Sequence, residues 1–146
     1  MEERVEKTFS TPDKCRLVVE NVKGKIEVEG WDRPETEVVA VRHQEWAEVE
    51  IVQDGDKVIA RTKGDGSPDK WRNWFNWNRT PVVEYTVRVP HACNLKLKNV
   101  NGPIHVKQVR GKVRVNNVDG SATLEAVSGD VQAETVNGEL EATQLM

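Results

Sequence analysis

The chain of 146 residues has no hydrophobic run approaching the roughly eighteen residues that a membrane-spanning helix needs. Its first residues, Met1 to Arg4, lack the apolar core of a signal peptide. We therefore expect no integral membrane segment and a soluble chain, either intracellular or separated from an export signal. The location stays open at this point.

Residues that carry chemistry are sparse. The three histidines are scattered and the two cysteines lie far apart, so the spacing predicts no metal site and no cofactor. There is no Gly-x-Ser-x-Gly, no P-loop and no dinucleotide-binding fingerprint. We expect a protein that is not an enzyme.

The net charge is small, but the charged residues are unevenly distributed along the chain. With 21 basic and 24 acidic residues, the net charge of -3 gives no overall reason to expect nucleic acid or an anionic membrane as a partner. Basic residues crowd residues 96–114, and acidic residues crowd residues 125–141. The last third of the chain is therefore polarised along its length.

That last third contains a repeat of nine residues, marked by glycine. The repeated glycines are Gly102, Gly111, Gly120, Gly129 and Gly138. Apolar residues recur two positions before each glycine and two and four positions after it. A unit this short buries its apolar side only by stacking on its neighbours. The sequence thus predicts an all-β chain, built as a parallel β-solenoid of nine-residue units.

Each unit reads as one short strand and a turn, because apolar and polar residues alternate after the glycine. The Asn-Gly and Asp-Gly pairs predict turns with positive φ. The valines two before each glycine are expected to point inward and fill a corner; they are Val100, Val109, Val118, Val127 and Val136.

Asx-Gly turns recur every eighteen residues, with different turns between them. This favours two units per coil and two facing sheets, with Lys107 near Glu125 and Lys112 near Asp130. Three units per coil would instead place Lys107 near Glu134. A calcium-binding nonapeptide roll is not expected, since the repeated Gly-Gly-x-Gly-x-Asp is missing.

The repeat begins early and is interrupted. Aligning Gly24 on Gly102 also aligns Cys15 on Cys93 and Leu17 on Leu95. We therefore expect one domain, residues 1–146, with first solenoid strands in 1–31, an insertion in 32–90 and the regular nonapeptide solenoid in 91–146. If the entry strands are neighbours, the two sulfurs could approach bonding distance; two buried free thiols are the alternative.

The insertion reads as a β-meander with a hairpin. Strands are expected at 38–41, at 48–52 and 58–61 around the Asp54-Gly55 turn, and at 81–90. Between them lies an aromatic segment that suits sugar rings, could equally stack on bases or lie at a lipid interface, or else covers a solenoid end. Its candidate ligand-binding or partner-binding residues are Trp71, Arg72, Trp74, Phe75, Trp77 and Arg79.

An enzymatic alternative rests on charged residues of the repeat. Parallel β-helix polysaccharide lyases place acidic and basic residues along one face. Lys107, Lys112, Arg114 and Glu125 could form such a groove, although a short solenoid offers a flat wall and not a cleft.

Three stretches carry a resemblance to a known family. They are residues 17–32, the strand Val83-Glu-Tyr-Thr-Val-Arg-Val-Pro, and the array of Gly-x-(Ile/Val)-x-(Val/Ala) units. In this order they resemble a bacterial domain family of unknown function whose members are called putative adhesins. The resemblance implies a β-solenoid attached to the cell envelope, with no catalytic residues to carry over.

Two functions follow as hypotheses. One is a non-enzymatic binding or adhesion module of the cell envelope, whose partner is a glycan or another envelope component. The other is a self-assembling scaffold in the style of the bactofilins, a homo-oligomer joined through complementary solenoid ends.

Overall fold

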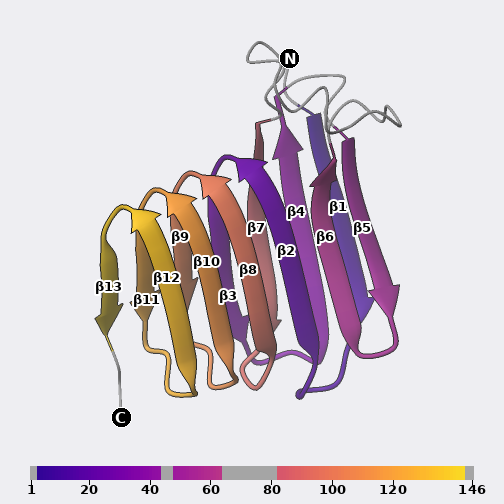
Figure 1. Cartoon of the computed structure of the whole chain (residues 1–146). Coiled ribbons are helices and arrows are strands. Elements are labelled where there is room, and N and C mark those ends of the chain that lie inside the picture. Colours follow the sequence, from indigo (N-terminus) through magenta and orange to yellow (C-terminus); the bar gives the residue numbers. More distant parts are fainter. Residues whose placement is uncertain (1–2, 44–47, 64–81, 144–146) are drawn as a thin grey trace.

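The computed structural model describes residues 3–43, 48–63 and 82–143, and in these ranges it contains strands and no helix. One sheet has seven strands, in the order β1 (Glu3–Ser10), β4 (Glu35–Arg42), β7 (Val83–Pro90), β3 (Ile26–Trp31), β9 (Ile104–Lys107), β11 (Ala122–Glu125) and β13 (Leu140–Thr143). The other has six, in the order β12 (Val131–Asn137), β10 (Val113–Asp119), β8 (Asn94–Asn101), β2 (Arg16–Lys23), β6 (Lys57–Lys63) and β5 (Glu48–Asp54). The two sheets lie face to face (Figure 1), so the predicted all-β, two-sheet architecture is confirmed.

Strands of the repeat pair in parallel with a shift of eighteen residues. Val113 of β10 is the Cα partner of Leu95 in β8 and of Val131 in β12. In the other sheet, Glu125 is the partner of Lys107, as expected for two sheets. The alternative pairing of Lys107 with Glu134 is wrong, because these residues lie in different sheets.

The early part of the chain joins the same ladders. Leu17 pairs with Leu95 and Ile26 with Ile104, both in parallel. The alignment of Gly24 on Gly102 is therefore confirmed residue by residue. Two segments far apart in the sequence become neighbours at the centre of each sheet (Figure 1).

The strands expected in residues 32–90 all form. The hairpin of β5 and β6 turns at Gly55, and β6 continues the six-stranded sheet in parallel with β2. In the seven-stranded sheet, β7 runs parallel to β3 and β4 antiparallel to β7. Strand β1 pairs antiparallel with β4 and carries mostly polar side chains, so no alternation in the sequence predicts it.

The hydrophobic core lies between the sheets, where alternate side chains of each strand point inward. Its largest fully buried side chain is Tyr85 on β7. The phenol oxygen of Tyr85 shares a hydrogen bond of 2.7 Å with Oγ1 of Thr62 on β6. Burial raises the pKa of Tyr85, so its hydroxyl stays protonated and joins the two sheets through a neutral hydrogen bond.

The corner valines do not behave as one set. Val109 and Val127 are buried, as expected. The prediction is wrong for Val118, which is 45% exposed, and for Val136, which is 74% exposed; Val100 is only half-buried. Strands β8, β10 and β12 continue past Val100, Val118 and Val136. Their alternation turns the residue before each valine inward, in place of the valine itself.

The residues turned inward form a row of polar side chains across the six-stranded sheet. This polar row consists of Thr62, Asn21, Asn99, Asn117 and Thr135. Asn99 Nδ2 donates to the Gly24 carbonyl at 2.8 Å, and Asn117 Nδ2 to the Gly102 carbonyl at 3.0 Å. We call each coil of the repeat a rung and each turn between successive strands a corner. The asparagine of one rung thus donates to the glycine carbonyl at the corner of the rung before it. Backbone pairing leaves that carbonyl without a partner.

The repeated glycines serve two different needs. Gly24, Gly102 and Gly120 have positive φ, as the turn chemistry predicts. The Asn137-Gly138 pair predicts positive φ as well, and this prediction is wrong, because Gly138 does not have it. At the other kind of corner positive φ belongs to Gln108 and Ala126, each three residues before the repeated glycine. Gly111 is required by close packing instead, because an added Cβ would lie 2.2 Å from the Cys93 carbonyl oxygen. The same holds for Gly129 and Gly138, which pack against Gly111 and Gly120.

Candidate binding surface

The aromatic segment of the insertion lies beyond the parts of the chain that the structure describes. Its candidate residues, Trp71, Arg72, Trp74, Phe75, Trp77 and Arg79, lie outside the described residues. The binding role given to them therefore stays a prediction. Surfaces that the structure does describe are the two outer sheet faces and the end formed by β12 and β13.

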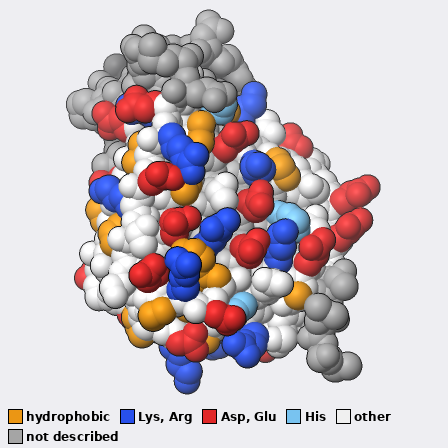
Figure 2. Space-filling model, turned by 180° about the vertical axis from the view of Figure 1, so that it is seen from behind, with side chains coloured by type: hydrophobic (Ala, Val, Ile, Leu, Met, Phe, Trp, Pro, Cys, Tyr) orange, Lys and Arg blue, Asp and Glu red, His pale blue; other side chains and the backbone are white. Residues whose placement is uncertain are grey.

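The outer face of the seven-stranded sheet carries charges of both signs in alternation (Figure 2). Lys107 Nζ lies 4.0 Å from Glu29 Oε2 across β9 and β3, and Lys25 Nζ lies 3.6 Å from Glu27 Oε2. Such exposed pairs contribute little stability, but they leave the face without a dominant sign.

Arginines on this face stack on an indole. The guanidinium carbons of Arg33 and Arg88 lie 5.1 Å and 5.7 Å from the ring centroid of Trp31, whose Nε1 donates to the Glu35 carbonyl. The Trp31 indole therefore already has cationic partners and a hydrogen-bond acceptor within the fold.

The outer face of the six-stranded sheet is different, because several of its cations have no ion-pair partner among the described residues, although Arg16 and Arg61 on the same face do. Exposed basic side chains project from β8 and β10 and from the loops that lead into β2 and β10. We call this set the basic face; it consists of Lys14, Lys96, Lys98, Arg110, Lys112 and Arg114. None of the six forms an ion pair with another residue in the described part of the chain.

Two members of the basic face stand directly opposite each other. Lys96 on β8 is the Cα partner of Arg114 on β10. Like charges at such a position disfavour folding by some tenths of a kcal/mol. Glu20 is the Cα partner of Lys98, but it does not neutralise the lysine. Its Oε1 pairs instead with Nη2 of Arg61 at 3.4 Å. The pattern is one that an anionic ligand would neutralise.

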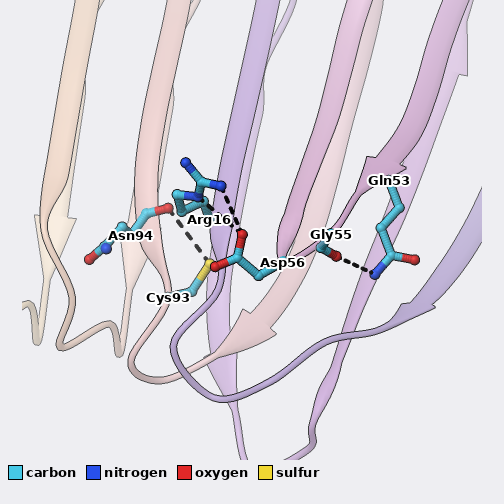
Figure 3. A network of polar contacts seen from close by, with 6 residues as sticks. All are labelled: Arg16, Gln53, Gly55, Asp56, Cys93 and Asn94. Carbon is cyan, nitrogen blue, oxygen red and sulfur yellow. Dashed lines mark hydrogen bonds and ion pairs between the residues drawn. The ribbon is translucent and has the colours of Figure 1, made fainter.

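A groove of about 620 Å³ crosses the basic face where the chain enters β8 and β10. It is lined by Lys14, Asn94, Arg110, Lys112, Ser128 and Asp130, together with Ala92, Gly111 and Gly129. Beside it, Arg16 on β2 is held by Asp56, with Nη2 to Oδ1 at 2.8 Å (Figure 3). The groove offers free cations and hydrogen-bonding groups along an open channel.

The lyase-like groove does not assemble. Lys107 and Glu125 lie on β9 and β11 of the seven-stranded sheet, whereas Arg114 lies on β10 of the six-stranded sheet and Lys112 just before it. The expected shared face is therefore wrong, because successive units alternate between two sheets. Sequence reasoning missed the basic face for the same reason; sorting the lysines by sheet, with a period of eighteen, would have found it.

The end of the fold at β12 and β13 is apolar and open within the described residues. Inward residues of the last rung remain accessible, Val131 at 38% and Leu140 at 46%. A second groove, of about 630 Å³, runs there along Val100, Val118 and Val136. Both strands are sheet edges.

Two further features bear on function. The described residues include no group of three or more histidine, cysteine or acidic side chains placed to hold a metal ion. Among the same residues, no helix is long and apolar enough to cross a membrane.

The fold defines a class of two-sheet β-proteins with mixed and parallel strands. No protein-family model matches the chain, and no curated protein matches its sequence. A "putative cell adhesion protein" from Clostridium sporogenes superposes with a TM-score of 0.56 at 11% identity, covering 99% of this chain and 100% of that one. This likeness establishes a shared fold.

Two structures from Parabacteroides distasonis are more distant. A "putative lipid binding protein" gives a TM-score of 0.36 at 14% identity, covering 94% of this chain and 59% of that one. A "putative adhesin" gives 0.32 at 14% identity, covering 91% and 56%. This chain therefore spans little more than half the length of either protein.

Proposed function

We propose that this chain is a non-enzymatic, adhesin-like binding module of the bacterial cell envelope, and that its basic face binds an anionic polysaccharide. The observation that carries the proposal is the set of six exposed cations without ion-pair partners on one sheet face. The shared fold with a protein named for cell adhesion supports the same class of function.

The chemistry of the face favours a flexible polyanion. Along β8, the Cα atoms of Lys96 and Lys98 are about 7 Å apart. Across the sheet, the Cα atom of Arg114 lies about 5 Å from that of Lys96. A flat array of this kind matches carboxylates repeated along a sugar chain. Because the whole protein has a net charge of -3, the attraction for a polyanion has to come from this local set of cations.

A matched pair of double variants tests the face. We expect Lys96→Gln with Arg114→Gln to weaken binding to polygalacturonate about tenfold or more, because two ligand-facing charges of about 0.7 kcal/mol each are lost. Binding is measured by calorimetry at low and at physiological salt. The control, Lys25→Gln with Arg88→Gln, changes the net charge equally on the other sheet and should bind as the parent does.

Further arms separate the alternatives. Neutral dextran should not bind, and a single-stranded DNA that competes as well as polygalacturonate would count against a polysaccharide ligand. Replacing Trp71, Trp74 and Trp77 together with alanine tests the aromatic segment. Loss of binding in that variant, with full binding in the Lys96 and Arg114 variant, would move the site from the basic face to the aromatic segment.

We also infer that the repeat is a β-solenoid of nine-residue units, two to a coil. Support comes from the parallel register of eighteen residues in both sheets and from the two alternating kinds of corner. Each coil would contribute one strand to each sheet.

Self-assembly is the second candidate function, and the accessible apolar end at β12 and β13 favours it. We expect the protein to associate at high concentration through this end, since apolar side chains and unpaired strand edges coincide there. Light scattering measures the association, and Leu140→Lys should reduce it. Replacing the exposed Val52 on β5 with lysine is the matched control. A parent protein that stays monomeric at high concentration and low salt would exclude this function.

A further inference from the structure

Cys15 and Cys93 occupy equivalent places at the start of two neighbouring strands. Each immediately precedes a strand, β2 or β8, and the next residues, Arg16 and Asn94, are Cα partners in the parallel ladder. The Asn94 amide donates to the Cys15 carbonyl at 2.9 Å, which carries the register through the cysteines. Both side chains are 0% exposed.

The two thiols have different hydrogen-bond partners. The Cys93 thiol donates a weak hydrogen bond to the Asn94 carbonyl oxygen, with 3.7 Å between sulfur and oxygen (Figure 3). Cys15 Sγ lies 3.9 Å from Oγ1 of the buried Thr36, which is in turn 3.0 Å from Thr11 Oγ1. Cys15 therefore sits among hydrogen-bond donors.

This environment separates the acidities of the two thiols. The neighbouring Cys93 thiol, against a smaller opposing effect of burial, lowers the pKa of Cys15 to about 7. The neighbouring Cys15 and burial raise the pKa of Cys93. In the folded chain Cys15 is therefore the readier thiolate, and it is the first to react when local opening admits an oxidant, since the thiolate is the nucleophile in disulfide exchange.

The backbone spacing suits a covalent bond. Adjacent strands lie about 4.8 Å apart, and in-register residues on them fall within the Cα separation of about 4.4 to 6.8 Å at which disulfides form. In the later rungs the equivalent positions are Gly111 and Gly129, so β2 and β8 are the place where the repeat sets two sulfurs side by side.

We propose that Cys15 and Cys93 form an intramolecular disulfide when the chain folds in the presence of a small-molecule disulfide. The Cys15 thiolate attacks one sulfur of the oxidant, forms a mixed disulfide and releases the first thiolate. The deprotonated Cys93 then attacks the Cys15 sulfur and releases the second. In total the chain loses two electrons and two protons, and one disulfide oxidant becomes two thiols.

The bond would join segments that lie 78 positions apart in the sequence. It would close a long loop of the unfolded chain, which includes the β5–β6 hairpin and the aromatic segment. Long loops lose the most conformational entropy on cross-linking, so the folded state gains accordingly. Because both sulfurs are buried, the exchange takes place before the fold closes or during local opening.

The test refolds the denatured, reduced protein with a mixture of oxidised and reduced glutathione. We expect mass spectrometry to show a loss of two hydrogen atoms, and alkylation under denaturing conditions to find no free thiol. The Tm of this species should lie roughly 10 °C above that of the same sample after reduction. The wild-type measurements need no variant and so do not depend on a variant's folding.

Single variants supply the controls. Cys15→Ser and Cys93→Ser should each retain one alkylatable thiol, and reductant should not change their Tm. Two free thiols per wild-type chain after oxidative refolding would overturn the proposal, and so would a bond that forms only between chains. These outcomes are independent of polysaccharide binding, because the readouts are mass and Tm.

Discussion

Replacing Gly102 with alanine is expected to lower the free energy of unfolding by about 4 kcal/mol, a substantial fraction of the stability of a domain this size. Gly102 has a φ of 137°, in a region that residues with a side chain rarely adopt. An added Cβ would also lie 2.2 Å from the Gly24 carbonyl oxygen of the neighbouring rung. To remove this clash, the corners at Gly24 and Gly102, which stack on each other, would have to move apart.

Gly55 is the matched control for this substitution. It also has positive φ, 63°, but no atom lies within 4 Å of the place an added Cβ would take. Gly55→Ala should therefore cost only about 1 kcal/mol, the cost of the backbone conformation alone. Urea denaturation of both variants measures the difference. Equal losses at the two positions would show that rung stacking does not restrict Gly102.

The sequence predicted the ladders well, because parallel stacking repeats one pattern in every rung. The alignment of Leu17 on Leu95 came from residue identities alone and is the observed register. The hairpin at Gly55 followed from its turn residues in the same way. Local alternation and turn chemistry are sufficient for such features.

The burial of the corner valines and the position of the basic face could not be predicted, because both depend on which sheet each residue belongs to. In the nine-residue repeat Val100 and Val109 are equivalent positions, yet they belong to different corners and differ in burial. The basic face escaped notice because Lys96 and Arg114 are eighteen residues apart and meet only across the sheet. The strand β1 has no strong alternation, and its position depends on pairing with β4.

Replacing Asn117 with aspartate is expected to cost about 3 kcal/mol at pH 7 and far less near pH 4. Asn117 is 2% exposed, and its Nδ2 donates to the Gly102 carbonyl at 3.0 Å. A carboxylate oxygen there would face the Gly102 carbonyl oxygen with no hydrogen between them, and it would carry a buried charge. Both effects disfavour the folded state. The protonated acid can donate its O–H to the same carbonyl.

The sign of the pH dependence follows from burial. Desolvation raises the pKa of the introduced carboxyl in the folded state above its value of about 3.9 in the unfolded chain. The unfolded state then binds fewer protons between the two values, so stability falls as pH rises through that window. The parent asparagine does not titrate, and subtracting the parent curve isolates the effect.

Asn116 provides the control within the same strand, since it is exposed on the outer face of β10. Asn116→Asp should change stability by no more than about 0.5 kcal/mol at either pH. Denaturation of both variants at pH 4 and pH 7 makes the comparison. If Asn117→Asp were as stable as Asn116→Asp at pH 7, the polar row would not be satisfying the corner carbonyls. The alternation of asparagine and valine at these corners would then need another explanation.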